Sequence, residues 1–321
     1  MKNMDENNLQ ALSTIAAMYY LDGISQDEIA RRFYTSRSTV SRMLKRAREQ
    51  GIVDIRVNFC AEHNEYYEEK LQKLFHIKAV IVNSEIAQET AGDSTGVRVR
   101  KALAEWMKEN IHSGDLIGVT RGSIFHDITA YLGEPTVQKV SFVQLMGMEA
   151  RTAGRHYARD VVTRLSKFYG GKPYYLDAPL VFDDQEAREH LFKVPTIAET
   201  LDATRKASLL MTTIPRLEAN QETHIWQGFI DREQFSSVIK AKVVGAMFGR
   251  AFDINGQFPD LDLNSSIVSV NMDVIKTRKI LAVSYGKEFA QAVLGALRSG
   301  YINYLVSDSD CIKEVIHLAE I

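Results

Sequence analysis

From residue 78 onward, short apolar runs alternate with longer amphipathic stretches, and this alternation constrains the fold more than any other feature of the sequence. Buried strands that alternate with helices favour a mostly parallel sheet with helices on both faces. We expect strands at 79–82, 116–119, 140–145, 174–176, 208–211, 267–270, 280–283 and 304–306. We expect helices at 97–110, 124–132, 160–168, 234–244 and 287–298. The pattern predicts an α/β domain over residues 77–321.

The composition excludes several classes of protein. A chain of 321 residues with 45% hydrophobic and 25% charged residues and a net charge of −2 is neither disordered nor a wholly basic coat for nucleic acid. Cys60 and Cys311 stand alone, and the eight histidines lack metal-ligand spacing, so we expect no disulfide framework and no metal. Dinucleotide and nucleotide-phosphate motifs are also missing, so we expect no cofactor.

The location of the protein is predicted from its N-terminus and from its apolar runs. Residues 1–10 are polar and acidic, unlike a signal peptide, and no run of about 18 apolar residues occurs. We therefore expect a cytoplasmic protein that does not contact a membrane.

Positive charge is concentrated between residues 31 and 48, where no acidic residue occurs. The basic residues of this segment are Arg31, Arg32, Arg37, Arg42, Lys45, Arg46 and Arg48. A basic segment in a nearly neutral chain indicates a small domain that binds a polyanion. We assign residues 1–58 to such a domain.

The apolar spacing within this domain predicts three helices. They are expected at 8–21, 26–33 and 37–50. Gly23 can end the first helix in the left-handed conformation. Ser25 and Glu28 form an S-x-x-E capping box for the second helix, and Ser36 can begin the third. The second helix is expected to bury Ile29, Ala30 and Phe33. Three short helices with these caps are typical of a helix-turn-helix.

The third helix is expected to carry the recognition chemistry. At about 100° per residue, one face holds Val40, Met43, Leu44 and Ala47 and packs inward. Ser38, Arg42 and Lys45 then point outward, flanked by Thr39, Ser41 and Arg46. Short hydroxyls can approach bases in a major groove, and arginine can bind guanine with two hydrogen bonds.

Phosphate contacts complete the expected DNA surface. Arg31, Arg32 and Arg48 are better placed for the DNA backbone than for bases. The predicted DNA-binding residues are Arg31, Arg32, Ser36, Arg37, Ser38, Thr39, Ser41, Arg42, Lys45 and Arg46. The competing interpretation is a solvated basic face on an ordinary helical hairpin. The short helix, the tight turn and the hydroxyl-rich helix start favour DNA binding over that alternative.

Residues 59–76 are expected to form a linker, after a short strand at 52–57. A charged helix at 60–75 would present aromatic and aliphatic side chains on one side. These are Tyr66, Tyr67, Leu71, Leu74 and Phe75. The side chains could pair two subunits or pack on the larger domain, and the sequence does not separate these alternatives.

Two polar turns follow predicted strands at their carboxyl ends, where ligands bind in parallel sheets. The first holds Thr120, Arg121, Gly122 and Ser123, and the second spans 284–287. Free backbone N–H groups, hydroxyls and a guanidinium at the first turn can converge on an anion, most simply a phosphate. A merely structural strand–turn–helix connection is the common alternative.

Several motifs resemble those of the SorC family of sugar-binding transcriptional regulators. The string SRSTVSRMLKRAREQG at 36–51, followed by IVDIRV, strongly resembles the family's helix-turn-helix, and GISQDEIA at 23–30 looks like its second helix. Further similar strings are IGVTRGS at 117–123, VQLMG at 143–147, DAPLV at 177–181 and VGAMFGRAFD at 244–253. The resemblance extends along nearly the whole chain, although Tyr34 stands where relatives usually have glycine.

The resemblance implies a Rossmann-like effector domain that is similar to sugar-phosphate isomerases and deaminases but binds a phosphosugar as a signal. It implies a tetramer that binds double-stranded operator DNA and regulates a carbohydrate or polyol operon, which we expect it to repress. The expected effector contacts are Thr120, Arg121, Gly122, Ser123, Gln144, Gly147, Arg250, Gly286 and Lys287.

Four departures from the family pattern imply a phosphorylated sugar, sugar acid or polyol that differs from the commonest effectors. Ala246 replaces a usual aspartate, Tyr285 replaces a turn glycine, and Phe289 replaces a phosphate-binding lysine. Met146 stands where some relatives have a lysine able to form a Schiff base. The lost positive charge could come from Arg121, Arg250 or Arg151.

Two other functions compete with regulation by an effector. An isomerase or deaminase with a DNA-binding appendage would need a general base beside the phosphate. His126 and Asp127 are the nearest candidates, but such a pair on a helix is more often structural, so we do not expect an enzyme. An architectural DNA binder without a ligand is the third alternative.

Overall fold

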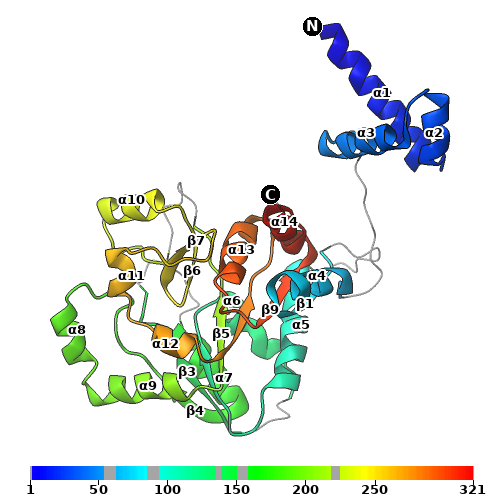
Figure 1. The fold of residues 1–321 in the computed structure, drawn as a ribbon. Coiled ribbons are helices and arrows are strands. Elements are labelled where there is room, and N and C mark those ends of the chain that lie inside the picture. Colours follow the sequence, from blue (N-terminus) through cyan, green and yellow to red (C-terminus); the bar gives the residue numbers. More distant parts are fainter. Residues whose placement is uncertain are drawn as a thin grey trace. The chain divides into compact units, whose positions relative to one another are not determined.

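The computed structural model describes residues 2–53, 63–84, 94–134, 139–149, 158–217 and 225–320, with side chains from residue 9 onward. The chain forms two compact units, Met1–Asn58 and Phe59–Ile321 (Figure 1). In the part that the structure describes, no helix is long and apolar enough to cross a membrane.

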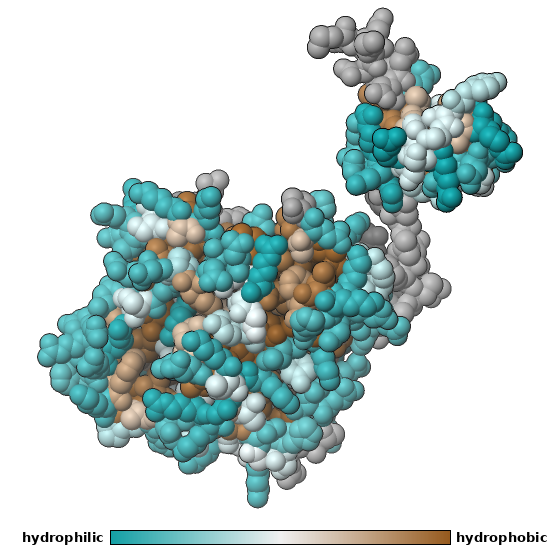
Figure 2. All heavy atoms as spheres, viewed as in Figure 1, coloured by the Kyte–Doolittle hydropathy of each residue, from teal (hydrophilic) through white to brown (hydrophobic). Residues whose placement is uncertain are grey.

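The first unit is a three-helix domain. Its helices are α1 (Lys2–Tyr20), α2 (Gln26–Arg32) and α3 (Arg37–Glu49). Its core consists of Leu12, Ile15, Ala16, Ile29, Ala30, Val40, Leu44 and Ala47. Gly23 follows α1 with φ of 67°, as the sequence predicts. Hydrophilic side chains cover most of the visible face of this unit (Figure 2).

Two expectations for α2 are wrong. Ser25 Oγ accepts a hydrogen bond from the Glu28 N–H at 3.3 Å, but the Glu28 carboxylate accepts one from Arg32 at 2.8 Å, so the capping box is only half formed. Phe33 is 40% exposed rather than buried. Because α2 ends at Arg32, Phe33 no longer follows the buried face of the helix.

The second unit contains a seven-stranded sheet with the order β1-β9-β8-β5-β2-β3-β4. The strands are β1 (Lys78–Val82), β2 (Leu116–Val119), β3 (Val140–Gln144), β4 (Gly170–Tyr174), β5 (Leu209–Thr213), β8 (Lys279–Val283) and β9 (Tyr304–Asp308). Every neighbouring pair in this sheet is parallel. The predicted parallel α/β fold is confirmed.

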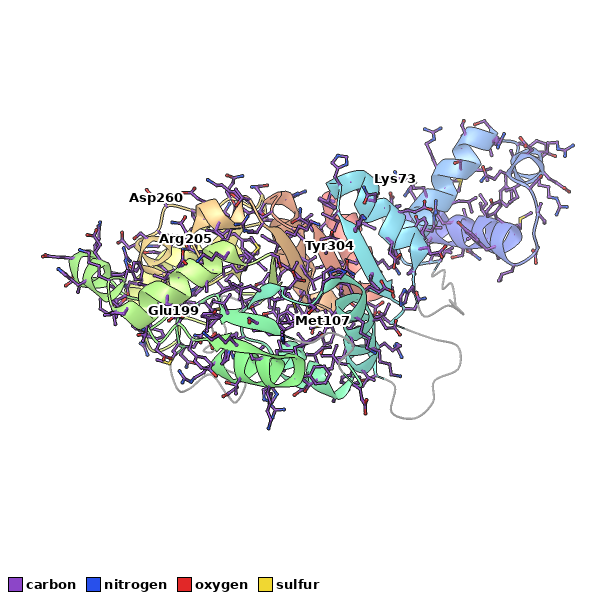
Figure 3. All side chains as sticks on the ribbon, turned by 90° about the horizontal axis from the view of Figure 1, so that it is seen from below. Lys73, Met107, Glu199, Arg205, Asp260 and Tyr304 are labelled. Atoms are coloured by element: carbon purple, nitrogen blue, oxygen red, sulfur yellow. The ribbon has the colours of Figure 1, made fainter. Side chains whose placement is uncertain are left out.

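Helices cover both faces of the sheet (Figure 1). Because side chains alternate along a strand, Ile280 and Ala282 join one core and Leu281 and Val283 join the other. The first core includes side chains of α4 (Glu65–Phe75), α9 (Pro195–Lys206), α13 (Ala290–Arg298) and α14 (Ser309–Ala319). The second includes side chains of α5 (Thr95–Asn110), α6 (Ser123–Asp127) and α7 (Ala158–Tyr169). Met107 on α5 is buried, whereas Lys73, Glu199 and Arg205 are exposed on α4 and α9 (Figure 3).

A two-stranded hairpin replaces part of an expected helix. It consists of β6 (Val243–Met247) and β7 (Arg250–Asp253), which pair antiparallel. The preceding α10 (Arg232–Lys240) ends four residues earlier than predicted, since Lys242 takes a positive φ of 53°. Phe248 and Gly249 also have positive φ, 51° and 82°, as a tight two-residue hairpin turn requires.

Two expected strands are also wrong. The run at 267–270 makes only isolated antiparallel bridges, in which Ile267 pairs with Val181 and Ser269 with Met146. The last strand of the sheet is Gly170–Tyr174 rather than 174–176, because Gly171 lets its backbone lie against Val140. The remaining short elements are α8 (Gln185–Leu191), α11 (Asp262–Ser266), α12 (Met272–Ile275), η1 (Ile128–Ala130) and η3 (Lys287–Phe289).

The predicted linker helix is shorter than expected. It begins at Glu65, after Asn64, whose side chain caps the helix and whose N–H donates to Ile81 O at 2.7 Å. Leu71 is buried, but Tyr66 and Leu74 are 57% and 48% exposed, so the five apolar side chains do not share one face. The start of the predicted helix and most of the strand at 52–57 lie outside the described residues.

Candidate functional site

The predicted recognition helix presents its polar side outward. Ser38, Arg42 and Lys45 are exposed, while Val40 and Leu44 on the opposite side are buried. The other predicted contacts are exposed as well, except Thr39, which is half-buried; they are Arg31, Arg32, Ser36, Arg37, Ser41 and Arg46. The first unit therefore gathers these side chains around α2 and α3 without burying their charges.

Ion pairs divide these cations into two groups. Arg32 lies 2.8 Å from Glu28, Arg37 lies 3.9 Å from Asp27, and Lys45 lies 3.7 Å from Glu49. Among the side chains described in this unit, Arg31, Arg42 and Arg46 have no carboxylate partner. These three arginines can bind a polyanion without first breaking an ion pair to a described carboxylate.

The start of α3 is held by a cluster of hydroxyls. Ser36 Oγ accepts a hydrogen bond from the Thr39 N–H at 3.1 Å and lies 2.8 Å from Ser38 Oγ. Ser36 thus acts as the helix cap. Tyr34, in the turn before it, has a φ of 50° and is 99% exposed, so the turn keeps its left-handed residue without glycine.

In the second unit, the carboxyl ends of β2 and β5 lie side by side at a change of direction in the topology. The chain runs from β2 to β3 on one side and from β5 to β8 on the other. Thr120 joins the two strand ends, because its N–H donates to Met211 O at 3.1 Å and its Oγ1 accepts from the Thr213 N–H at 3.3 Å. Ligands of open α/β sheets bind at such a point.

The turn after β2 needs glycine at position 122. Gly122 has φ of 150°, and a Cβ there would lie 2.7 Å from Thr213 Cγ2. The first helical hydrogen bond of α6 is donated by the His126 N–H to Gly122 O, so the N–H groups of Ser123 and the next two residues precede it. Because α6 has only five residues, in place of the helix expected at 124–132, its dipole contributes little.

Arg121 in this turn pairs with a buried carboxylate that the sequence did not predict. Arg121 Nη1 lies 3.1 Å from Glu149 Oε2, and the Glu149 side chain is only 3% exposed. Burial raises the pKa of Glu149 to about 7, although Arg121 opposes the shift. The other carboxylate oxygen, Oε1, has no hydrogen-bond partner in the part of the chain that the structure describes.

Gln144 at the end of β3 is fully buried, and it lines a cavity together with Glu149. Its Nε2 donates to Met146 O at 2.8 Å and to Leu176 O at 3.3 Å, while its Oε1 has no partner among the described residues. The cavity has a volume of about 420 Å³ and is lined by Gln144, Gly147, Met148, Glu149, Ala158, Arg159 and Asp160. A Cβ at Gly147 would lie 2.4 Å from Pro179 O, so this wall also needs glycine.

The second polar turn is closed by internal contacts. The Gly286 N–H donates to Asp308 Oδ1 at 2.9 Å, and Lys287 Nζ lies 3.3 Å from Glu314. Lys287 lines a different cavity, together with Arg216 and Glu314. The expected contacts Gly286 and Lys287 therefore do not join the cavity that Gln144, Gly147 and Glu149 line.

Arg250 reaches the end of β3 from the hairpin. Its Nη1 donates to Val270 O at 3.1 Å, and the Val270 N–H donates to Leu145 O at 2.7 Å. Burial, with a smaller contribution from Arg188, lowers the pKa of Arg250 to about 10. Arg151, the third candidate for positive charge, lies outside the described residues.

The candidate general base is hydrogen-bonded to the next residue on α6. His126 Nδ1 lies 2.7 Å from Asp127 Oδ1, and Asp127 Oδ2 lies 3.8 Å from Arg100. Among the residues with described placement, no group of three His, Cys, Asp or Glu could hold a metal ion.

Comparison with known proteins adds to this geometry. Residues 60–317 match the family model described as "Putative sugar-binding domain", and residues 8–58 match the model "MarR family". The chain is 26% identical to the deoxyribonucleoside regulator of Bacillus subtilis over 98% of this chain and 99% of that protein. It is also 26% identical to the sorbitol operon regulator of Klebsiella pneumoniae, over 97% and 98% of the two chains.

Solved structures share the fold. The full-length sorbitol operon regulator SorC from Klebsiella pneumoniae superposes with a TM-score of 0.70 at 22% identity, over 96% of this chain and 98% of that chain. A transcriptional regulator from Streptococcus pneumoniae gives a TM-score of 0.73 at 18% identity, over 80% of this chain and 98% of that one. These relatives and neighbours are named as regulators rather than as enzymes, and the Streptococcus pneumoniae protein is named as a transcriptional regulator.

Proposed function

Because the chain belongs to the SorC family of sugar-binding transcriptional regulators, we propose that it represses a carbohydrate or polyol catabolic operon and leaves its operator when a phosphorylated sugar or polyol binds. The observation that carries this proposal is the placement of two kinds of polar group. The first unit exposes cations on a helix-turn-helix, and the second holds polar groups around a cavity at the end of a parallel sheet.

The operator contacts follow from the exposed face of α3. We assign base reading in the major groove to Ser38, Ser41 and Arg42, which are exposed, with Arg42 as the contact to guanine. Arg31 and Arg46, which lack carboxylate partners among the described side chains, supply phosphate contacts. Arg32, Arg37 and Lys45 must first leave their acidic neighbours and contribute less.

The effector phosphate is assigned to the turn after β2. Ser123 offers an exposed hydroxyl and backbone N–H groups, and Arg121 offers a guanidinium between this turn and the cavity. Thr120 and Gly122 shape the turn rather than bind the ligand, since Thr120 Oγ1 is engaged with β5. The rest of the ligand extends toward Gln144 and Gly147.

Release from the operator requires that the ligand bind two subunit arrangements unequally. A tenfold difference in effector affinity supplies only about 1.4 kcal/mol. A tetramer in the cytoplasm, with paired recognition helices on a palindromic operator, would sum this difference over several subunits.

A thermal-shift screen of the full chain against phosphorylated sugars and polyols tests the proposal, with and without operator DNA. We expect at least one compound to raise the melting temperature of the free protein and to lower its affinity for the operator. Ser123→Ala should remove both effects while the operator affinity without ligand stays unchanged. An effector that still acts fully on this variant would place the anchor elsewhere, and a complete lack of response to all compounds would refute effector control.

A further inference from the structure

We propose that Glu149 and Gln144 form a subsite that binds hydroxyl groups of the effector and excludes a second anionic group. The subsite selects monophosphates of uncharged sugars or polyols over bisphosphates and phosphorylated sugar acids. This inference rests on the proposed function, because it assigns contacts to the hydroxyl-bearing part of the effector whose phosphate was assigned above.

The amide of Gln144 can act only as an acceptor toward the cavity. Its Nε2 already donates to two carbonyl oxygens, those of Met146 and Leu176. Turning the amide over would place its oxygen against both carbonyls, so the orientation is fixed. The Oε1 atom is left buried without a donor among the described residues, and a ligand hydroxyl supplies one.

Glu149 presents a second acceptor at the same cavity. Its side chain is 3% exposed, Oε2 lies 3.1 Å from Arg121 Nη1, and Oε1 has no hydrogen-bond partner within the described ranges. Buried polar atoms in folded proteins nearly always have partners, because an unmade hydrogen bond forfeits their hydration. Among the described residues of this cavity, Gln144 Oε1 and Glu149 Oε1 are therefore two acceptors available to the hydroxyl groups of a ligand.

The donors are hydroxyls rather than an ammonium group. Arg121 already places a positive charge 3.1 Å from Glu149, and a second cation there would be repelled at short range. Hydroxyls carry no charge and can donate to Glu149 and Gln144 in turn. A cavity of about 420 Å³ lies in the size range of small-molecule sites.

The charges around the cavity disfavour a second anion. Glu149 lines it with a buried side chain, whereas Asp160 is exposed to water that screens its charge. Arg159 is held by Asp177 and stacks 4.1 Å from the Tyr175 ring. Arg121 pairs with Glu149 from the turn after β2, to which the effector phosphate is assigned. If the end of the ligand opposite its bound phosphate carried a carboxylate or a second phosphate, that anion would lie near Glu149. Little water is present there to screen the repulsion between the two negative charges.

Titration calorimetry of the full chain tests this selectivity with matched probes: inorganic phosphate, sorbitol 6-phosphate, fructose 6-phosphate, fructose 1,6-bisphosphate, 6-phosphogluconate and glucosamine 6-phosphate. For the unmodified protein we expect fructose 6-phosphate or sorbitol 6-phosphate to bind at least about 10-fold more tightly than the bisphosphate and the sugar acid, the order that one charge-assisted hydrogen bond supplies. Glu149→Gln should weaken the uncharged monophosphate, strengthen the bisphosphate and reduce the ratio to below about 3-fold. Inorganic phosphate should bind this variant at least as tightly as it binds the unmodified protein.

Asp160→Asn is the matched control, because Asp160 also lines the cavity but is exposed. It should leave the ratio nearly unchanged, and unaltered operator binding would show that both variants are folded. Equal or tighter binding of the bisphosphate or of the amino sugar by the unmodified protein would overturn the proposal, as would an unchanged ratio in Glu149→Gln. If no probe binds, the proposed function fails together with this inference; if probes bind through Ser123 without selectivity, only this inference fails.

Discussion

The two units of the molecule place their functional polar groups in opposite ways. The first unit leaves Ser38, Arg42 and Lys45 in water on the outside of α3, whereas the second buries Gln144 and Glu149 at the end of a sheet. Exposed charges cost little in water, and they favour binding to a duplex because they release counterions condensed on the DNA. Buried acceptors cost stability until a ligand supplies donors. A surface for a large polyanion can therefore be built without strain, but a pocket for a small metabolite cannot.

The largest expected effect of a substitution separates the two polar turns within the second unit. Arg121→Ala should lower the affinity for the effector by about 100-fold, because it removes a charge-assisted contact and leaves Glu149 without its cation. Lys287→Ala should change the affinity less than about threefold, since Lys287 pairs with Glu314 at another cavity. Titration calorimetry measures both, and equal losses would show that the second turn also binds the ligand.

The stability cost of the buried site should depend on pH. The pKa of Glu149 is raised in the folded protein from 4.5 to about 7, so the folded state loses stability as pH rises through that window. Glu149→Gln should therefore stabilise the ligand-free protein by roughly 2 kcal/mol at pH 8 and by little near pH 4.5. Urea denaturation at the two pH values checks this, and a variant that is less stable at pH 8 would contradict the burial cost.

Removing a base contact in the first unit should weaken operator recognition and leave effector binding by the second unit unchanged. Arg42→Ala should weaken operator binding by about 1–3 kcal/mol and relax the preference at one base position. Competition binding against operator variants measures the preference. A uniform loss on operator and random DNA would place Arg42 on phosphate instead.

The smallest expected effect separates two neighbouring arginines on α2. Arg31 has no carboxylate partner among the described side chains, whereas Arg32 lies 2.8 Å from Glu28. Arg31→Ala should lower affinity evenly on all sequences and reduce the salt slope by about one, with a smaller change for Arg32→Ala. Salt titrations of DNA binding measure both slopes, and identical slopes would remove the distinction that the ion pair makes.

The sequence predicts the first unit better than the second because helical periodicity decides which side chains are exposed. Spacing alone puts Val40 and Leu44 inside and Arg42 outside, and the structure agrees. The same reasoning failed for Phe33, where the helix ends one residue early, and for Tyr66, which lies off the buried face.

The pocket depends on contacts between distant segments, which spacing does not encode. Glu149, which follows β3, pairs with Arg121, which follows β2. The side-chain amide of Gln144 is fixed by a hydrogen bond to Leu176 O. An acidic residue just after the VQLMG strand was the only signal that could have indicated Glu149. The turn at 120–123 was predictable because a glycine and hydroxyls follow a buried strand. The hydrogen bond from the Gly286 N–H to Asp308, which occupies the second turn, was not predictable from the spacing.

A double-mutant cycle on the full chain tests the division between the two units most directly. Fluorescence anisotropy would give operator affinity, and calorimetry would give sorbitol 6-phosphate affinity, for Arg42→Ala, Arg121→Ala and the double variant. We expect Arg42→Ala to weaken only ligand-free operator binding and Arg121→Ala to weaken only effector binding. The double variant should show each of these losses unchanged within about 0.5 kcal/mol. Loss of ligand-free operator affinity in Arg121→Ala as large as that in Arg42→Ala would contradict the division.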